Sequence, residues 1–405
     1  MIWAGSGISS ERDPVRAAEE AARAAMARAG LQRAGLVLLF STSDHSAKYA
    51  EMLRAVRQAT GSGNLVGCSG AGVLTSEGEI EGERGVAVMA LAADRATAAP
   101  FLVQNLRGRD REAGHEIARL VEPYRTGGSM LAIFPDTLNC NPEALFQGVN
   151  ERLGPIQVVG AGAADCGGGD VTFQMCGGRV ITNGVAGVLL SGELTCSLGV
   201  TQSCRPIGRA VEVTAAEGNV IESLDGRPPL EALAEAVGEH LERDLERLAG
   251  HVFVGFPTQP VRAGEPFRRG TYFVRNIIGV DSESGAVAIG RRISTGDVIS
   301  FVLRDPLGAR EDLKAMLDEE CLAGSLGVPR LGLYFNCCAR GSSLYGLPGI
   351  DTAFIGRAFE SLPMAGFFSF FEFATMGGEP QLHNYTGVMT LISEQPEGSG
   401  SEVTQ

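Results

Sequence analysis

The sequence lacks a basic stretch and a long hydrophobic run. Its 405 residues carry 34 Lys and Arg against 48 Asp and Glu, a formal net charge of −14, and no segment is rich in Lys and Arg. A protein that binds a phosphate backbone needs a basic surface, so we expect no nucleic-acid partner. No apolar run reaches the roughly 18 residues of a membrane helix, and residues 1–14 lack the basic and apolar parts of a signal peptide. We therefore predict a cytoplasmic protein without membrane insertion.

The usual motifs of metal sites and catalytic sites are also missing. The nine Cys form no CxxC pair and are odd in number, and no two of the five His stand at HxxH or HExxH spacing. These spacings predict neither disulfides nor a metal site. No GxSxG elbow, P-loop or dinucleotide-binding loop occurs either. The motifs therefore point to no catalytic residue.

What the sequence does contain is one arrangement that occurs more than once. Residues 35–41 predict a buried strand, 46–59 an amphipathic helix and 85–91 a later strand. The same order recurs at 129–190 and again at 330–392. In each copy a strand phenylalanine precedes a strand glycine by a similar interval of 27, 26 or 31 residues: Phe40 and Gly67, Phe134 and Gly160, Phe335 and Gly366.

Segments outside these copies extend the correspondence and predict the fold class. Residues 101–120 and 301–317 both have the pattern of a strand, a polar turn and a helix, and 252–290 resembles a weaker copy. We infer an internal duplication. The predicted fold is α/β (α+β) with two related halves in a layered sandwich, each half a mixed or antiparallel sheet with outer helices. A ligand cleft is expected between the halves.

The chain is predicted to have four segments. They are an N-terminal helix and extension, a first domain, a second domain and a disordered polar tail, at 1–29, 30–225, 226–393 and 394–405. The boundary near 225 is placed by the segment LDGRPPLEAL, where one Gly and two Pro precede a long helical stretch. Within the extension, residues 14–29 predict a helix with Asp13 as its N-cap and Pro14 at its first position.

Polar residues follow the predicted strands of each copy, at the position where layered α/β proteins bind ligands. The candidate ligand-binding residues are Asp44, His45, Cys68 and Ser69 in the first copy, Asp165 in the second, and Cys337, Arg340, Gly341, Glu372, His383, Asn384 and Thr386 in the third. The alternative is that these residues cap helices and form turns, as Ser, Asp and Asn often do at strand-to-helix junctions.

Three of these groupings predict more specific chemistry. Glu372 stands in the aromatic segment FFSFFEFA, where a buried carboxylate requires a partner, and we predict a charge pair with Arg340 lining a C-terminal cleft. A cation near Cys337 would lower the pKa of its thiol and make it reactive; the alternative is an unreactive buried cysteine. Asp44 and His45 form a candidate acid/base pair, although neighbours in sequence need not face one another.

From about residue 30 to residue 393, the chain resembles the FIST (F-box and intracellular signal transduction) family. The resemblance includes both the N-terminal and the C-terminal domain of that family. The segments FNCCARG and GFFSFFEFATMGGEPQLHNYTGVMTL carry the most specific part of the resemblance. They match the family pattern at Cys337, Arg340, Gly341, Gly366, Glu372, Asn384 and Thr386. Phe371 departs from the pattern, which usually has Gly before the Glu.

The resemblance implies a sensory module that binds a small ligand, such as an amino acid, and relays the signal to a separate partner. Histidine kinases and cyclic-dinucleotide enzymes are the partners that the family suggests. We expect the protein to lack an F-box segment and an output domain, and therefore to act through a separate partner. One branch of the family binds haem, so a haem-based gas sensor is an alternative, although we expect no cofactor. A second alternative is an enzyme that uses Cys337, Arg340 and Glu372; whether the chain is an enzyme stays open, and we favour binding over catalysis.

Overall fold

The computed structural model describes residues 1–165, 167, 171–238, 250–322 and 327–395. They form two compact units. Unit 1 consists of Met1–Val200, Lys314–Leu382 and Thr386–Gln405, and unit 2 of Thr201–Leu313 and His383–Tyr385. The domain boundary that we predict at residue 225 falls inside unit 2, so it stays a prediction about the sequence.

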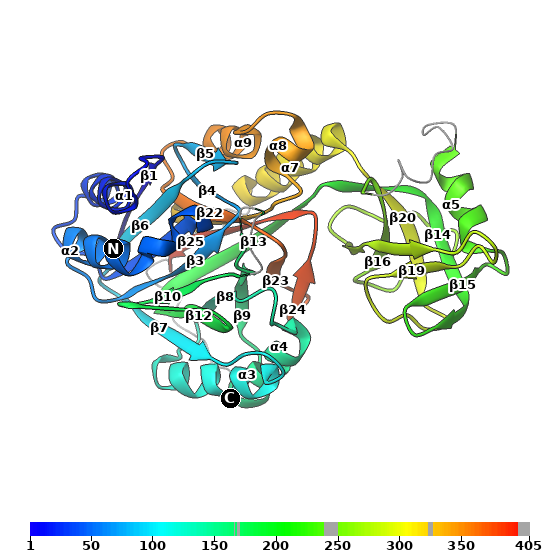
Figure 1. The fold of residues 1–405 in the computed structure, drawn as a ribbon, viewed down its shortest axis with the longest axis horizontal. Helices are drawn as coiled ribbons and strands as arrows, with labels where there is room; N and C mark the ends of the chain where they lie inside the picture. The colour runs from blue at the N-terminus through cyan, green and yellow to red at the C-terminus, as the bar shows by residue number, and fades with distance from the viewer. Residues whose placement is uncertain (166, 168–170, 239–249, 323–326, 396–405) are drawn as a thin grey trace. The chain divides into compact units, whose positions relative to one another are not determined.

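Unit 1 is built from three six-stranded sheets (Figure 1). Sheet 1 has the order β1 (Ile2–Ser9), β6 (Val86–Ala93), β2 (Leu36–Thr42), β3 (Leu65–Gly70), β10 (Gln174–Cys176) and β11 (Arg179–Ile181). Sheet 2 has the order β7 (Ala96–Gln104), β12 (Gly184–Gly192), β8 (Met130–Pro135), β9 (Gln157–Ala161), β23 (Glu372–Met376) and β24 (Glu379–His383). Sheet 3 has the order β13 (Leu194–Gln202), β25 (Thr386–Glu394), β21 (Pro329–Cys337), β22 (Met364–Ser369), β4 (Gly72–Thr75) and β5 (Gly78–Glu81).

Each sheet carries the same chain path, so the unit consists of three repeats. In every repeat the central strand pairs in parallel with the strand after the next helix: β2 with β3, β8 with β9, and β21 with β22. A hairpin follows, and the last strand returns antiparallel to the central one: β6, β12 and β25. We call these repeats 1, 2 and 3. In repeat 3 the main segment of unit 2, Thr201–Leu313, begins at the end of β13 and ends within the helix α7 (Pro306–Leu322).

The hairpin of each repeat completes the sheet of another repeat. The hairpin β4–β5 of repeat 1 pairs with β22 of repeat 3, and β10 of repeat 2 pairs with β3 of repeat 1. The exchange is closed by repeat 3, whose strand β23 pairs with β9 of repeat 2. The three sheets are therefore interlocked in a cycle.

The inner faces of the three sheets share one hydrophobic core. Its centre holds the three phenylalanines of the sequence repeat, whose rings lie 5.4 Å (Phe40–Phe134), 5.7 Å (Phe134–Phe335) and 6.3 Å (Phe40–Phe335) apart in edge-on contacts. The matching glycines lie where the paired strands approach most closely. A Cβ at Gly67, Gly160 or Gly366 would lie 1.7, 2.0 or 1.7 Å from the carbonyl oxygen of the residue before each phenylalanine. The recurring Phe and Gly positions in the sequence therefore reflect the same strand register in all three repeats.

Helices cover the outer faces of the sheets (Figure 1). Helices α1 (Pro14–Ala29) and α2 (Tyr49–Thr60) pack on sheet 1, and α3 (Asp110–Val121) and α4 (Pro142–Leu153) on sheet 2. Repeat 3 has α7 (Pro306–Leu322), α8 (Gly341–Tyr345) and α9 (Ile350–Ala358), and two short 3₁₀ turns are η1 (Ser43–Lys48) and η2 (Glu122–Tyr124). The predicted start of α1 is confirmed: the side chain of Asp13 accepts the N–H of Arg16 at 2.9 Å, and Pro14 is the first helical residue.

Unit 2 is a seven-stranded antiparallel sheet with one described helix, α5 (Pro229–Val237). Its strand order is β17 (Tyr272–Arg275), β16 (Val252–Pro257), β20 (Val298–Arg304), β14 (Cys204–Glu217), β15 (Val220–Leu224), β19 (Val287–Ile289) and β18 (Ile277–Val280). This order differs from that of the repeats.

The structure confirms the mixed α/β fold with repeated units and corrects two details. The weaker copy predicted at 252–290 lies in the antiparallel sheet of unit 2. The strand at 301 is β20 of that sheet, so in repeat 3 the place of β7 is taken by β13 and only the helix of the predicted flank corresponds. Over the described ranges, no helix is long and apolar enough to cross a membrane.

Candidate functional site

The carboxyl end of the central strand in repeat 3 carries a buried cluster of polar side chains. Glu372, at the start of β23, is fully buried. Its Oε1 accepts the hydroxyl of Ser369 at 2.7 Å, and its Oε2 accepts the hydroxyl of Thr386 at 2.6 Å. Burial, and then the nearby Cys337, raise the pKa of Glu372 well above its usual range. Burial therefore favours the protonated form of this side chain, which can donate as well as accept hydrogen bonds.

The three repeats place different residues at the equivalent positions of this layer. Side chains alternate along a strand, so residues two positions after the core phenylalanines point to the same inner face; they are Thr42, Asp136 and Cys337. One layer below, the residues paired across to the exchanged hairpins are Gln174 opposite Cys68, Glu372 opposite Ala161 and Val73 opposite Phe367. Within the described part of the chain, the Oε1 of buried Gln174 has no hydrogen-bond partner. At this equivalent position the three exchanged hairpins thus carry an amide, a carboxyl and an aliphatic side chain.

The structure corrects the predicted ion pair of Arg340. Its bidentate partner is Asp351 of α9, with Nε to Oδ2 at 3.0 Å and Nη2 to Oδ1 at 3.1 Å, and both side chains are fully buried. The hydroxyls of Tyr334 and Tyr345 donate to the same carboxylate at 2.8 and 2.9 Å. Arg340 acts on Glu372 only as the last of the causes that set its pKa, behind burial and nearer groups. Arg340 therefore holds α8 and α9 together on sheet 3, and the partner of Glu372 is a pair of hydroxyls.

The exchanged hairpin β4–β5 clamps the same two helices. Glu79 accepts the N–H groups of Gly349 at 2.8 Å and Thr352 at 3.1 Å, at the start of α9. Glu81 accepts the N–H of Ser342 at 3.1 Å. Gly341 has a φ of +56°, and a Cβ there would lie 2.4 Å from the Glu81 carboxylate. Gly341 is thus required by this contact, which accounts for its place in the predicted set without a ligand.

The candidate residues of repeat 1 gather at the carboxyl ends of β2 and β3. Asp165, on the loop after β9, accepts the hydroxyl of Ser43. The hydroxyl of Ser69 accepts the N–H of Phe173 at 3.0 Å, so it fixes the loop before β10. Cys68 belongs to the central core, and burial raises the pKa of its thiol well above the usual range. Ser43 was not predicted, because only the structure brings it to Asp165.

The predicted acid/base pair of repeat 1 is not formed. Asp44 is exposed, whereas His45 is buried and neither ring nitrogen has a hydrogen-bond partner among the described residues. Burial and then Arg84 lower the pKa of His45, so the ring is neutral at pH 7. The two adjacent side chains leave the 3₁₀ turn in different directions.

His383 and Asn384 separate from the other predicted residues, because they belong to unit 2. The side-chain oxygen of Asn384 accepts a hydrogen bond from Arg275 at 3.3 Å. Burial, followed by the charge of Arg275, lowers the pKa of His383 to about 4. Thr386, two residues later, returns to unit 1 and bonds to Glu372. Within unit 1, Arg340 therefore belongs to the ion pair with Asp351, whereas Cys337 and Thr386 lie near Glu372.

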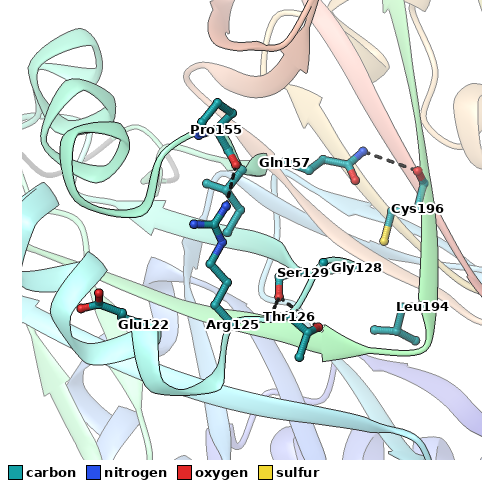
Figure 2. A pocket seen from close by; sticks show the side chains of 11 residues that line it. Glu122, Arg125, Thr126, Gly128, Ser129, Pro155, Gln157, Leu194 and Cys196 are labelled. Atoms are coloured by element: carbon teal, nitrogen blue, oxygen red, sulfur yellow. Dashed lines mark hydrogen bonds between the residues drawn. The ribbon is translucent and has the colours of Figure 1, made fainter. Parts of the chain in front are cut away.

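A polar cavity that the sequence analysis did not predict lies in repeat 2, at the amino ends of β8 and β9 (Figure 2). Its volume is about 590 Å³. It is lined by Glu122, Arg125, Thr126, Gly127, Gly128, Ser129, Pro155, Ile156, Gln157, Leu194 and Cys196. Figure 2 shows the guanidinium of Arg125 beside Pro155, whose carbonyl oxygen accepts from Nη2 at 2.9 Å. The only sequence signal is the short polar segment RTGGS at 125–129.

Comparison with known proteins identifies the family. The FIST N domain matches residues 35–227 and the FIST C domain matches residues 229–375. The chain belongs to the FIST family. FIST domains are associated with sensing in signal transduction. In this FIST protein the N domain contains the polar cavity and the C domain contains Cys337, Arg340 and Glu372, while His383, Asn384 and Thr386 lie beyond the matched range.

Similar FIST proteins occur in bacteria and archaea. The chain is 30% identical over 392 residues to the uncharacterized protein MT0656 of Mycobacterium tuberculosis, covering 96% of this chain and 99% of the relative. A second relative from the same species, MT0897, is 30% identical over 397 residues, with 97% and 99% coverage. The protein MJ1623 of Methanocaldococcus jannaschii is 25% identical over 238 residues, which is 53% of this chain and 45% of the relative.

Solved structures show only a distant likeness. A cyanuric acid hydrolase from A. caulinodans aligns over 98% of this chain and 100% of its own, with 12% identity and a TM-score of 0.34. A chorismatase aligns over 97% and 98%, with 9% identity and a TM-score of 0.35. These scores are too low to carry an argument about the chemistry of this FIST protein.

Proposed function

We propose that this FIST protein is a sensory module that binds a small zwitterionic ligand, such as an amino acid, in the polar cavity of repeat 2. The observation that carries the proposal is that Arg125 and Glu122, of opposite charge, line one cavity together with the apolar side chains of Ile156 and Leu194 (Figure 2). In a bound amino acid, the carboxylate would face Arg125, the ammonium group would face Glu122, and the side chain would face the apolar residues.

The hydrogen bonds of the cavity leave capacity for such a ligand. Arg125 has five N–H donors, of which the structure directs one at Leu153 O and one at Pro155 O. Arg152 occupies only the Oε2 of Glu122, at 3.2 Å, which leaves Oε1 for an ammonium group. A volume of about 590 Å³ lies within the usual range of small-molecule sites, roughly 300–1,000 Å³.

A rival placement follows from the residues predicted at the strand ends. There the buried carboxyl group of Glu372 lies beside Cys337, and the buried side chain of Asn336 has no hydrogen-bond partner among the described residues. Keeping such groups in a core lowers stability, which is typical of functional sites. We favour the polar cavity, because a ligand reaches it without displacing buried strands.

The test is calorimetric titration of the full chain with the common amino acids. We expect saturable binding of one or a few of them, and at least a tenfold loss of affinity in Arg125→Gln. A charge-assisted hydrogen bond contributes about 1.5–3 kcal/mol, and 1.4 kcal/mol is a factor of ten. The matched control is Arg119→Gln, an exposed arginine in the last turn of α3, which should bind as the unchanged protein does.

Four other results would overturn parts of the proposal. Loss of binding in Glu372→Gln with full binding in Arg125→Gln would move the ligand to the strand ends. Turnover of a ligand that Cys337→Ala abolishes would establish the enzyme alternative, and a Soret band in the purified protein would establish a haem sensor. Absence of any amino-acid binding would reject the ligand class.

We further propose that the bound state is relayed to a separate signalling protein, such as a histidine kinase or a cyclic-dinucleotide enzyme. The family association with signal transduction supports this step. The corresponding experiment compares the affinity of the protein for a candidate histidine kinase with and without the ligand. Ligand and partner must change each other's affinity by the same factor if they are coupled. Equal partner affinity in both states would reject the relay.

A further inference from the structure

A second cavity lies on the axis of unit 1, at the amino ends of the central strands and opposite the polar layer. Its volume is about 280 Å³. Apolar side chains dominate its wall, and all three repeats contribute to it: Ile2, Leu36, Leu91, Ala92, Ala93, Ala96, Ala98, Leu190, Leu194, Leu331 and Ile392. Gly35, Asn64 and Thr97 complete the lining. We call this cavity the axial pocket.

The axial pocket follows from the register of the repeats. Leu36 pairs with Leu91 in sheet 1, and Leu331 pairs with Ile392 in sheet 3. The equivalent residue of sheet 2 is Leu190. The core above these residues is filled by the three central phenylalanines, whereas here the facing positions on β6 and β7 are alanines. Small side chains at the end of the axis therefore leave a space that the layers above do not have.

The lining of the axial pocket favours an apolar molecule over water. The pocket opens to the surface at its rim, where Gly35 is exposed, and the buried side chains of Leu331 and Ile392 line its inner end. A water molecule in a cavity needs two to four polar partners, and the wall offers these only at the rim, where Asn64 and Thr97 are exposed. Apolar cavities of about 150 Å³ in other proteins bind benzene, and the axial pocket is larger.

The charges beside the pocket indicate that its ligand is neutral. A smaller hollow shares Ile2, Ala93, Ala96 and Leu194 with the axial pocket, and its other lining residues are Met1, Gln395 and the charged residues Asp94, Arg95, Glu193 and Glu394. There Arg95 pairs with Glu193 at 2.8 Å, and Glu394 accepts the N–H of Ile2 and approaches Arg330 at 3.6 Å. These charges compensate one another, so the rim selects neither an anionic nor a cationic headgroup.

We propose that the axial pocket is a binding site for a small neutral apolar molecule, of the size of one or two fused aromatic rings. This site is independent of the polar cavity and differs from it in ligand class. A molecule held there contacts all three repeats, and it would stabilise unit 1 as any ligand that binds only the folded state does.

Titration of the full chain with benzene and with indole, followed by ligand-observed NMR and calorimetry, tests the proposal. We expect saturable binding with a one-to-one ratio. Ala93→Leu and Ala96→Leu, made separately, each add a branched side chain to the pocket wall and should weaken binding at least tenfold. Filling a cavity commonly raises stability, so the midpoint of thermal unfolding should stay equal or rise.

Matched controls distinguish binding in the axial pocket from nonspecific binding to the protein surface. Ala50→Leu places the same side chain on the exposed face of α2 and should bind both probes as the unchanged protein does. Arg125→Gln and Glu372→Gln should also bind them unchanged, which keeps this test distinct from that of the proposed function. Absence of saturable binding, or equal binding by the control and by whichever filled variant folds, would overturn the proposal.

Discussion

Repeats 1 and 3 share a backbone frame but secure the helix behind the central strand in different ways. Repeat 1 uses one helix of 12 residues, α2, which packs on sheet 1 through Tyr49, Met52, Leu53 and Val56. Repeat 3 has two short helices, α8 and α9, of 5 and 9 residues. They are held by the buried Arg340–Asp351 pair and by two glutamates of an exchanged hairpin.

The difference shows which positions the fold fixes and which it leaves open. The close-contact glycines recur in all three repeats, because a Cβ there would collide with the backbone of the paired strand. The phenylalanines recur because their rings meet at the centre of the shared core. The residues beyond the strand ends vary from apolar to ionic. Because the packing of the strands sets the fold, the residues at the carboxyl ends of the three central strands can differ in chemistry.

The largest effect should come from removing the cation of repeat 3. Arg340→Met leaves the Asp351 carboxylate buried without its counter-charge, and loss of one partner of such a pair lowers stability by about 3–5 kcal/mol. Urea unfolding measures the change. The control Arg357→Met, at an exposed site on α9, should change stability by less than about 0.5 kcal/mol.

A double variant sharpens the same comparison. Arg340→Met with Asp351→Leu removes both charges and should recover about 1–2 kcal/mol of the loss, because an apolar pair often replaces a buried ion pair at little cost. A single variant as stable as the control would contradict the assignment of Arg340 as the centre of the α8–α9 anchor.

The second effect is a pH dependence at the hairpin clamp. Burial, and then the charge of Asp351, raise the pKa of Glu79 to about 7. A carboxyl with a raised folded-state pKa binds its proton more tightly when folded, so its contribution to stability is lost as pH rises from about 4.5 through 7. The full shift corresponds to roughly 3 kcal/mol, and we expect on the order of 2–3 kcal/mol between pH 5 and pH 8.

Urea unfolding of the unchanged protein and of Glu79→Gln at the two pH values isolates this contribution. The unchanged protein should lose stability relative to the variant as pH rises. Glu77→Gln, an exposed site on the same hairpin, serves as the control and should follow the unchanged protein. Parallel pH profiles for the unchanged protein and Glu79→Gln would disprove the titration.

The smallest effect tests whether the three repeats are equivalent at the centre of the core. Phe40→Leu, Phe134→Leu and Phe335→Leu each replace one ring of the central cluster by a smaller apolar group, with an expected loss of about 1–1.5 kcal/mol. The three losses should agree within about 0.5 kcal/mol if the repeats are equivalent at this layer. A loss confined to one of them would break the comparison, and thermal or urea unfolding is sufficient to detect it.

The sequence predicts the repeats well because their signal is local. A buried strand, a helix and a second strand can be recognised from hydrophobic periodicity, and the interval from Phe to Gly keeps the register visible. The exchange of hairpins cannot be recognised in this way. The strand pair β3–β10 joins residues more than 100 positions apart, and no local pattern specifies which edge a short hairpin will join.

The candidate site is predicted less well, because partners depend on tertiary contacts. The sequence indicates that Glu372 is buried, but two hydroxyls satisfy it and Asp351 takes the nearby arginine. Asp351 occupies the first turn of a helix, where an aspartate usually serves only the helix terminus. The two cavities cannot be recognised in the sequence, because an empty volume depends on how side chains from distant segments pack around it.

The exchange of hairpins also decides how this chain can be divided. The match to the FIST N domain ends at residue 227, yet sheet 2 is completed by β23 at Glu372–Met376, from the other end of the chain. A fragment that ends at the domain boundary would leave β9 as an open edge, ready to pair with another copy. The domains are distinct in sequence, but the unit that folds is a ring of three sheets closed only by the last hairpin.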